Sequence, residues 1–349
     1  MTLNNRFMEK GINAVLITLL LVGAGIYSCF AQDTAMPDAT LTVEPRQSLD
    51  SLTSATEGIN LASNLNFSAV ASPLTLVNSS FSEFKPAVSM HGTRLYFSRA
   101  FHPNNTAGTK DKEDIWYAEI DKETSQLSEP KRFEGMFNNG GPNFVMSSSI
   151  SGDTLFLGNQ YSKKGKMRAG FSYSVRQGNG WSEPRAIKVK NEYNFSETGN
   201  AYISFESSVM ISAVERGDSK GETDLYVSFI VNGEATEPVN MGPALNSARA
   251  ESSPYLSKDQ GTIYFTSKGH NGYGGYDIYM SRRLDDTWTN WSKPENLGPV
   301  VNSERDEEFF SMTHCEKFAY FSKQVDSENT DIYKVTIAEL FGANKAIFR

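Results

Sequence analysis

The sequence has little of what several classes of function require. It has no run of basic residues that could follow a phosphate backbone, which excludes nucleic acid as a partner. Its four histidines stand far apart, without the close spacing of a zinc site. It has only two cysteines, Cys29 and Cys315, so a chain that loses Cys29 with an N-terminal signal cannot form an intramolecular disulfide.

What is present is enough for a large core. The chain has 349 residues, of which 39% are hydrophobic, and a formal net charge of −8. This length and composition fit one large all-β domain or two smaller ones.

Long apolar runs are also lacking, apart from one near the N-terminus. Arg6 and Lys10 precede the apolar stretch GINAVLITLLLVGAGIY, and small residues follow in CFAQD. This order predicts a signal peptide over residues 1–31, cleaved after Ala31. A retained membrane anchor and a lipid attached at Cys29 are the alternatives, and they are the only routes to membrane association that the sequence offers.

The following residues, 32–62, are rich in Ser, Thr, Ala and Asp and predict a flexible tether. From there the chain repeats itself every 54 to 60 residues or so. Five copies of a paired strand signal, such as SPYLSKDQGTIYFTS, are each followed by a third strand signal, such as DIYMSRR. Four copies add a short segment with proline, such as WSKPENLG, which suits an edge strand.

Four short strands in each period predict a single β-propeller over residues 63–338, most simply with five blades of four antiparallel strands, followed by a tail over residues 339–349. The fifth copy lacks its proline strand, and FSAVASPLTLVN near residue 70 has no other blade to join. We therefore expect this N-terminal segment to close the ring as the outer strand of the fifth blade. A six-bladed ring would need another repeat.

The repeat resembles the TolB-type, WD-repeat-like propeller repeat found in bacterial envelope proteins, including proteins with an OmpA-like domain. The resemblance covers about four-fifths of the chain and is strongest in the copy from Ser253 to Gly298. It implies an envelope protein, secreted across the inner membrane and periplasmic or associated with the outer membrane. It also implies a binding or scaffold role toward an envelope protein or a cell-wall component, but it fixes no ligand.

One chemical regularity accompanies the repeat. Equivalent positions hold a carboxylate in four copies and an amide in the second: Glu83, Asn143, Glu197, Glu251 and Glu307. Such a ring could bind a cation such as calcium, or a basic peptide, at one mouth of the channel. We favour the alternative that each side chain accepts hydrogen bonds from a neighbouring loop, since a task repeated in every blade is usually structural. An Asp begins the third strand signal in four copies and predicts a fixed turn before it.

Two further groups of residues are candidates for a site. The loop GHNGYGGY displays His270, Tyr273 and Tyr276 on a glycine-rich frame, as an adaptable recognition surface would. The stretch SERDEEFF has no counterpart in the repeats, and Asp306 and Glu308 would be the first suspects in a glycan hydrolase. We favour a solvated loop for this stretch.

The sequence therefore predicts a protein without catalytic residues and without a cofactor, acting as a non-enzymatic binding or scaffold module. A secreted propeller enzyme that acts on glycans, as a glycosidase or in the manner of a sialidase, is the alternative. A third alternative is a propeller stabilised by a metal at the carboxylate ring.

Overall fold

The computed structural model describes residues 70–161, 167–196, 199–204 and 206–341. The predicted signal peptide and tether, and Glu197 of the carboxylate ring, lie outside these residues. Cys315 is disulfide-bonded, and Cys29 lies outside the described residues. No helix among the described residues has the length and apolar character needed to cross a membrane.

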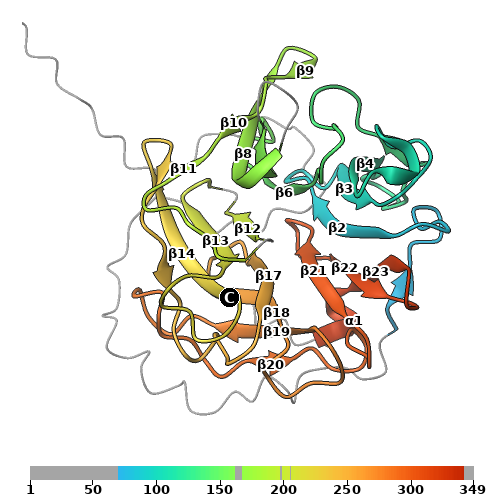
Figure 1. Ribbon diagram of the computed structural model, residues 1–349. Coiled ribbons are helices and arrows are strands. Elements are labelled where there is room, and N and C mark those ends of the chain that lie inside the picture. The colour runs from blue at the N-terminus through green and yellow to red at the C-terminus, as the bar shows by residue number, and fades with distance from the viewer. Residues whose placement is uncertain (1–69, 162–166, 197–198, 205, 342–349) are drawn as a thin grey trace, which may run out of the picture.

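Five sheets are arranged around one axis and form a five-bladed β-propeller, which confirms the predicted fold (Figure 1). Each blade has an inner strand next to the axis, and every inner strand contacts the inner strands of both neighbouring blades. The inner strands are β2 (Glu83–Val88), β6 (Val145–Ser148), β12 (Asn200–Ile203), β17 (Glu251–Leu256) and β21 (Glu307–Met312).

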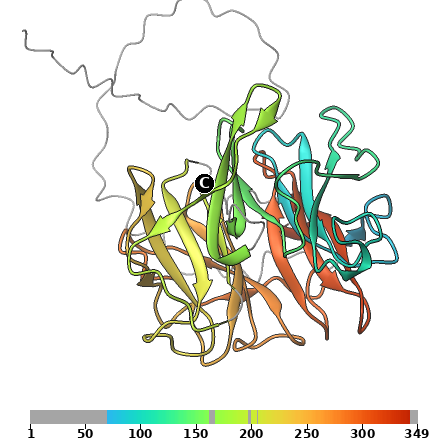
Figure 2. The ribbon, with the colours of Figure 1, turned by 45° about the horizontal axis from the view of Figure 1, so that its top comes forward.

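The second and third strands of each blade lie progressively further from the axis and pair antiparallel with their neighbours. The second strands are β3 (Arg94–Arg99), β7 (Thr154–Tyr161), β13 (Val209–Val214), β18 (Thr262–Ser267) and β22 (Phe318–Gln324). The third strands are β4 (Asp114–Glu119), β8 (Met167–Gln177), β14 (Asp224–Val231), β19 (Asp277–Arg282) and β23 (Thr330–Thr336). In the tilted view of Figure 2 these strands form the wall of the ring.

The outer strands are short, as the prolines beside them predict. They are β5 (Lys131–Arg132), β10 (Arg185–Ala186), β16 (Val239–Asn240), β20 (Glu295–Asn296) and β1 (Ser72–Pro73). Three additional strands widen the second and third blades: β9 (Gly180–Trp181), β11 (Lys188–Val189) and β15 (Glu234–Ala235). Beyond the strands there is a 3-10 helix, η3 (Gly108–Lys110), and a short helix, α1 (Ile337–Phe341).

The ring closes as expected, through the N-terminal segment. Strand β1 pairs antiparallel with β23, so that the blue start of the described chain lies beside the red fifth blade (Figure 1). The Asn78 side chain strengthens this junction, because it donates to the Ile332 carbonyl and accepts from the Ile332 N–H, both at 2.9 Å. The two ends of the propeller are thereby held in one sheet.

The core lies between the blades, because each sheet is covered by a neighbour on both faces. All six residues of β13 and of β18 are buried for this reason. Burial on both faces explains why these two strands lack a strict alternation of apolar and polar residues. Helix α1 adds Leu340 and Phe341 to the same core, so packing continues into the first residues of the predicted tail.

Candidate functional site

The predicted carboxylate ring lies where the inner strands begin, at the end of the propeller that we call the entry face. Glu83, Glu251 and Glu307 are fully buried, as is Asn143. Each Glu accepts hydrogen bonds from the backbone N–H and the hydroxyl of a serine four residues earlier. For Glu251 the distances from Ser247 N and Oγ are 2.8 and 2.6 Å.

A second partner comes from the neighbouring strand of the same blade. Arg99 Nε donates to Glu83 at 2.6 Å, and Lys323 Nζ lies 3.1 Å from Glu307. In the second blade, Asn143 accepts from the Asn139 N–H at 2.8 Å. This is the hydrogen-bonding arrangement of the structural alternative, and a binding role for the ring stays a prediction. No group of three His, Cys, Asp or Glu side chains among the described residues could hold a metal ion.

Next to this ring, the pairing of three inner strands is irregular. Strands β2, β17 and β21 each contain a register shift just after their first two residues. At the shift, Lys85, Ser253 and Phe309 adopt positive φ values of 55°, 47° and 55°. Bulges of this kind re-aim side chains and are common beside functional sites. Here they direct three chemically different residues into the centre of the ring.

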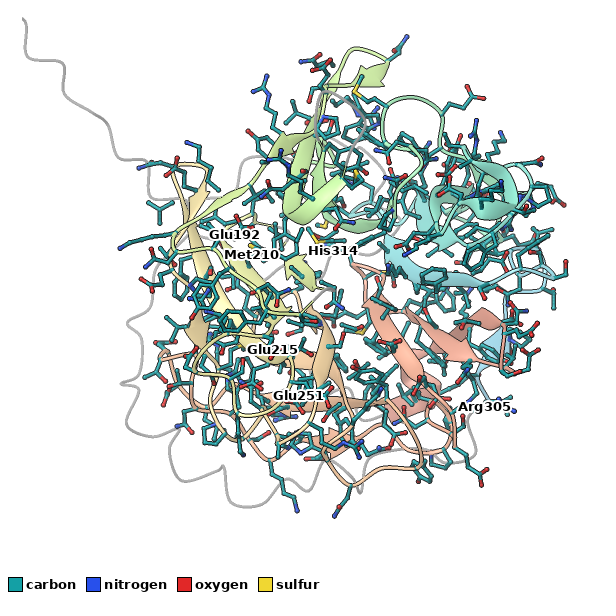
Figure 3. All side chains as sticks on the ribbon, viewed as in Figure 1. Glu192, Met210, Glu215, Glu251, Arg305 and His314 are labelled. Atoms are coloured by element: carbon teal, nitrogen blue, oxygen red, sulfur yellow. The ribbon has the colours of Figure 1, made fainter. Side chains whose placement is uncertain are left out.

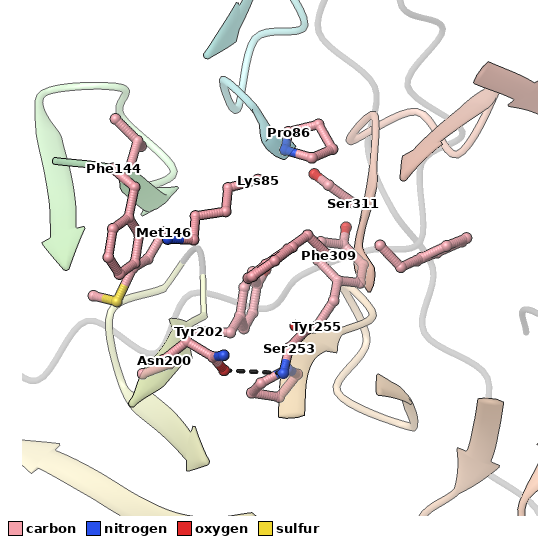
Figure 4. A pocket seen from close by; sticks show the side chains of 14 residues that line it. Lys85, Pro86, Phe144, Met146, Asn200, Tyr202, Ser253, Tyr255, Phe309 and Ser311 are labelled. Carbon is pink, nitrogen blue, oxygen red and sulfur yellow. Dashed lines mark hydrogen bonds between the residues drawn. The ribbon is translucent and has the colours of Figure 1, made fainter. Parts of the chain in front are cut away.

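Side chains from all five inner strands meet on the axis below these bulges (Figure 4). Tyr202, Tyr255 and Phe309 lie close together there, and Asn200 accepts a hydrogen bond from the Ser253 N–H at 2.9 Å. The space left between the side chains is only about 40 Å³, which is too small for a ligand. The channel is therefore filled at this depth.

Above this floor lies the entry pocket, a cavity of about 640 Å³ on the entry face. This volume falls in the range of small-molecule sites. Its walls combine rings, amides and charges. The rings are Phe144, Phe171, Tyr193, Tyr276 and Phe309; the amides are Asn159, Gln160, Asn194 and Asn200; the charged residues are Lys85, Glu113, Arg168, Glu192, Arg216 and Glu308.

Glu308 is the carboxylic acid with the most perturbed surroundings in the entry pocket. It is half-buried at the start of β21, and Ser253 Oγ lies 3.5 Å from its Oε1. Burial, and to a smaller extent the negative charge of Asp306, raise the pKa of Glu308 to about 7. The solvated-loop interpretation of this stretch was therefore wrong for Glu308. Asp306 does not line the pocket and instead accepts a hydrogen bond from the Tyr276 N–H at 2.7 Å.

A second carboxylate reaches the same pocket within an ion pair. Lys85 Nζ lies 2.7 and 2.8 Å from the two carboxylate oxygens of Glu113, which precedes β4. The ammonium group also sits 4.0 Å from the centroid of the Phe144 ring. Neither residue was predicted from the sequence. The available signal was that Lys85 is the only charged residue at its position in the repeat, where the other copies have Val145, Gly199, Ser253 and Phe309.

The three residues of the predicted recognition loop lie in different surroundings. Tyr276 lines the entry pocket, with Lys268 Nζ 4.2 Å from its ring centroid. His270 Nε2 instead lies 2.8 Å from the Leu245 carbonyl, and burial lowers the pKa of the imidazole. Tyr273 is half exposed and lies outside the pocket lining. A recognition role for these residues stays a prediction, and Tyr276 alone of the three joins the candidate site.

Comparison with known proteins gives structural likeness at very low identity. No protein-family model matches the sequence, and no curated protein matches it. The structure aligns with TolB from Acinetobacter baumannii at 10% identity and a TM-score of 0.43, over 75% of this chain but only 56% of TolB. It also aligns with α-L-arabinofuranosidases from Lactobacillus brevis (13% identity, TM-score 0.45, 75% of this chain and 92% of the other) and Podospora anserina (12%, 0.45, 78% and 98%).

These comparisons correct one prediction. We expected a protein that is not an enzyme, yet several of the aligned structures are glycoside hydrolases. Since one fold serves many functions, the function of this chain has to be argued from the residues of the entry pocket.

Proposed function

We propose that the protein hydrolyses a glycosidic bond in the entry pocket, with Glu308 as the proton donor. The observation that carries this proposal is the pKa of Glu308, raised to about 7 in a blind pocket. A carboxyl group with such a pKa keeps its proton close to neutral pH and can deliver it to a leaving oxygen. An ordinary surface glutamate would already be ionised there.

Glycoside hydrolysis also requires a carboxylate that stays charged. Glu113, paired with Lys85, is the carboxylate that we assign to this task, so that the two carboxyl groups have different partners. In the proposed reaction, Glu308 protonates the glycosidic oxygen as the bond from this oxygen to the anomeric carbon breaks. Glu113 stabilises the positive charge that develops on the sugar ring. A water molecule then adds to the anomeric carbon, and we assign the removal of its proton to Glu192, the third carboxylate that lines the pocket.

The walls of the pocket support a sugar as the substrate. The amides of Asn159, Gln160 and Asn200 can both donate to and accept from hydroxyl groups. The rings of Phe144 and Tyr276 offer flat apolar faces for the C–H side of a sugar. A few polar groups among apolar walls are typical of small-molecule sites.

A hydrolysis screen tests the proposal. The purified chain is incubated with a panel of plant, bacterial and host polysaccharides, and released reducing ends are measured. We expect activity on at least one glycan, lowered by about 10²–10⁴-fold in Glu308→Gln, the usual contribution of a general acid. Glu304→Gln is the matched control, because Glu304 is exposed on the loop that precedes β21. A chain inactive on every glycan, or an undiminished Glu308→Gln variant, would contradict the proposal.

We also propose that the protein acts in the cell envelope. The support is the N-terminal order of basic, apolar and small residues, together with the TolB-like repeat. Fractionation of the native cells, with mass spectrometry of the N-terminal peptide, tests this location. A peptide that begins at Gln32 in the periplasmic fraction agrees with it, whereas full-length chain in the cytoplasm contradicts it.

A further inference from the structure

Arg216, on the wall of the entry pocket, is a buried cation with an N–H group that has no acceptor. It follows β13 in the third blade and is only 7% exposed. Its Nη1 donates to the Asn191 carbonyl at 3.1 Å, and its guanidinium carbon lies 4.0 Å from the centroid of the Tyr193 ring. Its Nε is buried and has no hydrogen-bond partner.

Burying a charged group lowers the stability of the fold unless a counter-ion or hydrogen-bond acceptors pair with it. A buried guanidinium without a counter-ion loses its hydration and gains little in return. Arg99, another buried cation on the entry face, does have a counter-ion, because its Nε lies 2.6 Å from Glu83 Oε1. Among the described residues, no carboxylate lies within ion-pair distance of Arg216. An anion that enters the pocket would supply the missing partner.

The surroundings favour a carboxylate carried by a sugar. Tyr193 holds the guanidinium plane from one side, which fixes the direction of its N–H groups. Arg168 stands at the exposed rim of the same pocket and adds a second positive charge at its mouth. Glu192 and Met210 line the same pocket and are labelled on the same side of the ring in Figure 3. A planar guanidinium matches a planar carboxylate through two parallel hydrogen bonds.

We infer that the entry pocket selects acidic glycans, and that Arg216 binds the carboxylate of a uronic acid. This inference names the substrate class of the proposed hydrolase and rests on that proposed function. Arg216 acts as a specificity residue, because neutral sugars would leave its Nε buried and unpaired. A site built for a polar group discriminates strongly against ligands that lack that group.

Binding measurements with matched ligands test the inference. The protein carries Glu308→Gln, which prevents turnover during the titration. Two ligand pairs are compared by calorimetry: tri-galacturonate with its carboxyl-reduced neutral form, and a glucuronate-bearing xylo-oligosaccharide with the unbranched one. We expect the acidic member of at least one pair to bind about 10–100-fold more tightly, as a charge-assisted buried hydrogen bond allows.

Variants assign this preference to its residue. Arg216→Gln should reduce the acidic preference to within about twofold of the neutral ligand. Arg305→Gln, which removes the same charge from an exposed loop far from Glu192 in Figure 3, should keep it. Arg216→Lys keeps the charge but not the planar fork, and should lose most of the preference. This variant carries the test if Arg216→Gln does not fold.

The outcomes separate this inference from the proposed function. Equal binding of both members in each pair, or a preference that survives in Arg216→Gln and Arg216→Lys, overturns the inference. If the screen then shows hydrolysis of neutral glycans, the proposed function stands without it. If acidic sugars bind through Arg216 but no glycan is hydrolysed, the hydrolase fails and the assignment of Arg216 stands.

Discussion

Glu307 and Glu308 are neighbours in the chain, but their carboxyl groups lie in different surroundings and have different roles. Glu307 is fully buried, is held by Ser303 and Lys323, and has equivalents in the other blades. Glu308 faces the entry pocket, where the equivalent positions hold Phe84, Phe144, Thr198 and Ser252. The carboxylate that recurs stabilises the ring, and the carboxylate that departs from the repeat is available for chemistry.

The largest expected effect is the loss of activity in Glu308→Gln, which should depend on the leaving group of the substrate. General-acid catalysis matters most when the departing oxygen is a poor leaving group. Glu308→Gln should therefore lose about 10²–10⁴-fold in kcat/KM on a natural glycan, and much less on a dinitrophenyl glycoside of the same sugar. Steady-state kinetics on the two substrates measure this difference. Equal losses on both would show that Glu308 is not the proton donor.

Removing a recurring carboxylate of the ring should lower the stability of the fold. Glu83→Ala leaves the Arg99 guanidinium, 6% exposed, without its counter-ion and leaves the Ser79 N–H without its acceptor. Removing one partner of a buried ion pair costs about 3–5 kcal/mol. Chemical denaturation should show this loss in the free energy of unfolding. Glu308→Ala serves as the comparison, and an equal destabilisation by both variants would erase the distinction between the two kinds of carboxylate.

The pH dependence of stability separates them in another way. The folded-state pKa of Glu308 is raised to about 7, above the ordinary value of 4.5, so the folded chain holds a proton that the unfolded chain releases between these values. This group therefore stabilises the fold less as the pH rises from about 4.5 to 7. Glu308→Gln should remove a part of this loss, on the order of 1 kcal/mol after allowance for solvent screening. Melting curves from pH 4 to 8 measure it, and parallel curves for both proteins would contradict it.

The smallest expected effect concerns the turns before the third strands. Asp277 accepts hydrogen bonds from the Tyr273 and Gly274 N–H groups, and Asp114 and Asp224 act in the same way in their blades. Asp277→Ala should cost about 1–2 kcal/mol. The second blade tolerates Gly170 at this position, which is why the expected loss is modest. A thermal melt measures the effect, and an unchanged melting temperature would show that the turn forms without the aspartate.

The fold was predictable because the repeat is local and the turns are regular. The paired strand signals correspond to the first two strands of each blade, and the N-terminal segment closes the ring through β1. The hydrogen-bonding alternative for the carboxylate ring was predictable too, since only a structural task recurs at every equivalent position. These features depend on residues that are close in sequence or related by the repeat.

The site was only partly predictable because it joins residues from different blades. Glu308 was named as a suspect for lacking a repeat counterpart, but its hydrogen bond with Ser253 and the nearby charge of Lys85 involve residues far away in sequence. Lys85 reaches the axis through a bulge that no pattern of alternation shows. The burial of Arg216 depends on the packing of its blade and has no signal in the sequence. Departure from a repeat therefore finds candidates, and three-dimensional contacts decide among them.

The pH dependence of kcat on a hydrolysed glycan tests the central claim most directly. If Glu308 donates the proton, kcat should fall above an apparent pKa near 7, and the residual activity of Glu308→Gln should lack this descending limb. A profile that stays flat from pH 5 to 9, or a descending limb that persists unchanged in Glu308→Gln, would contradict the claim that this unrepeated carboxyl group is the acid of the site.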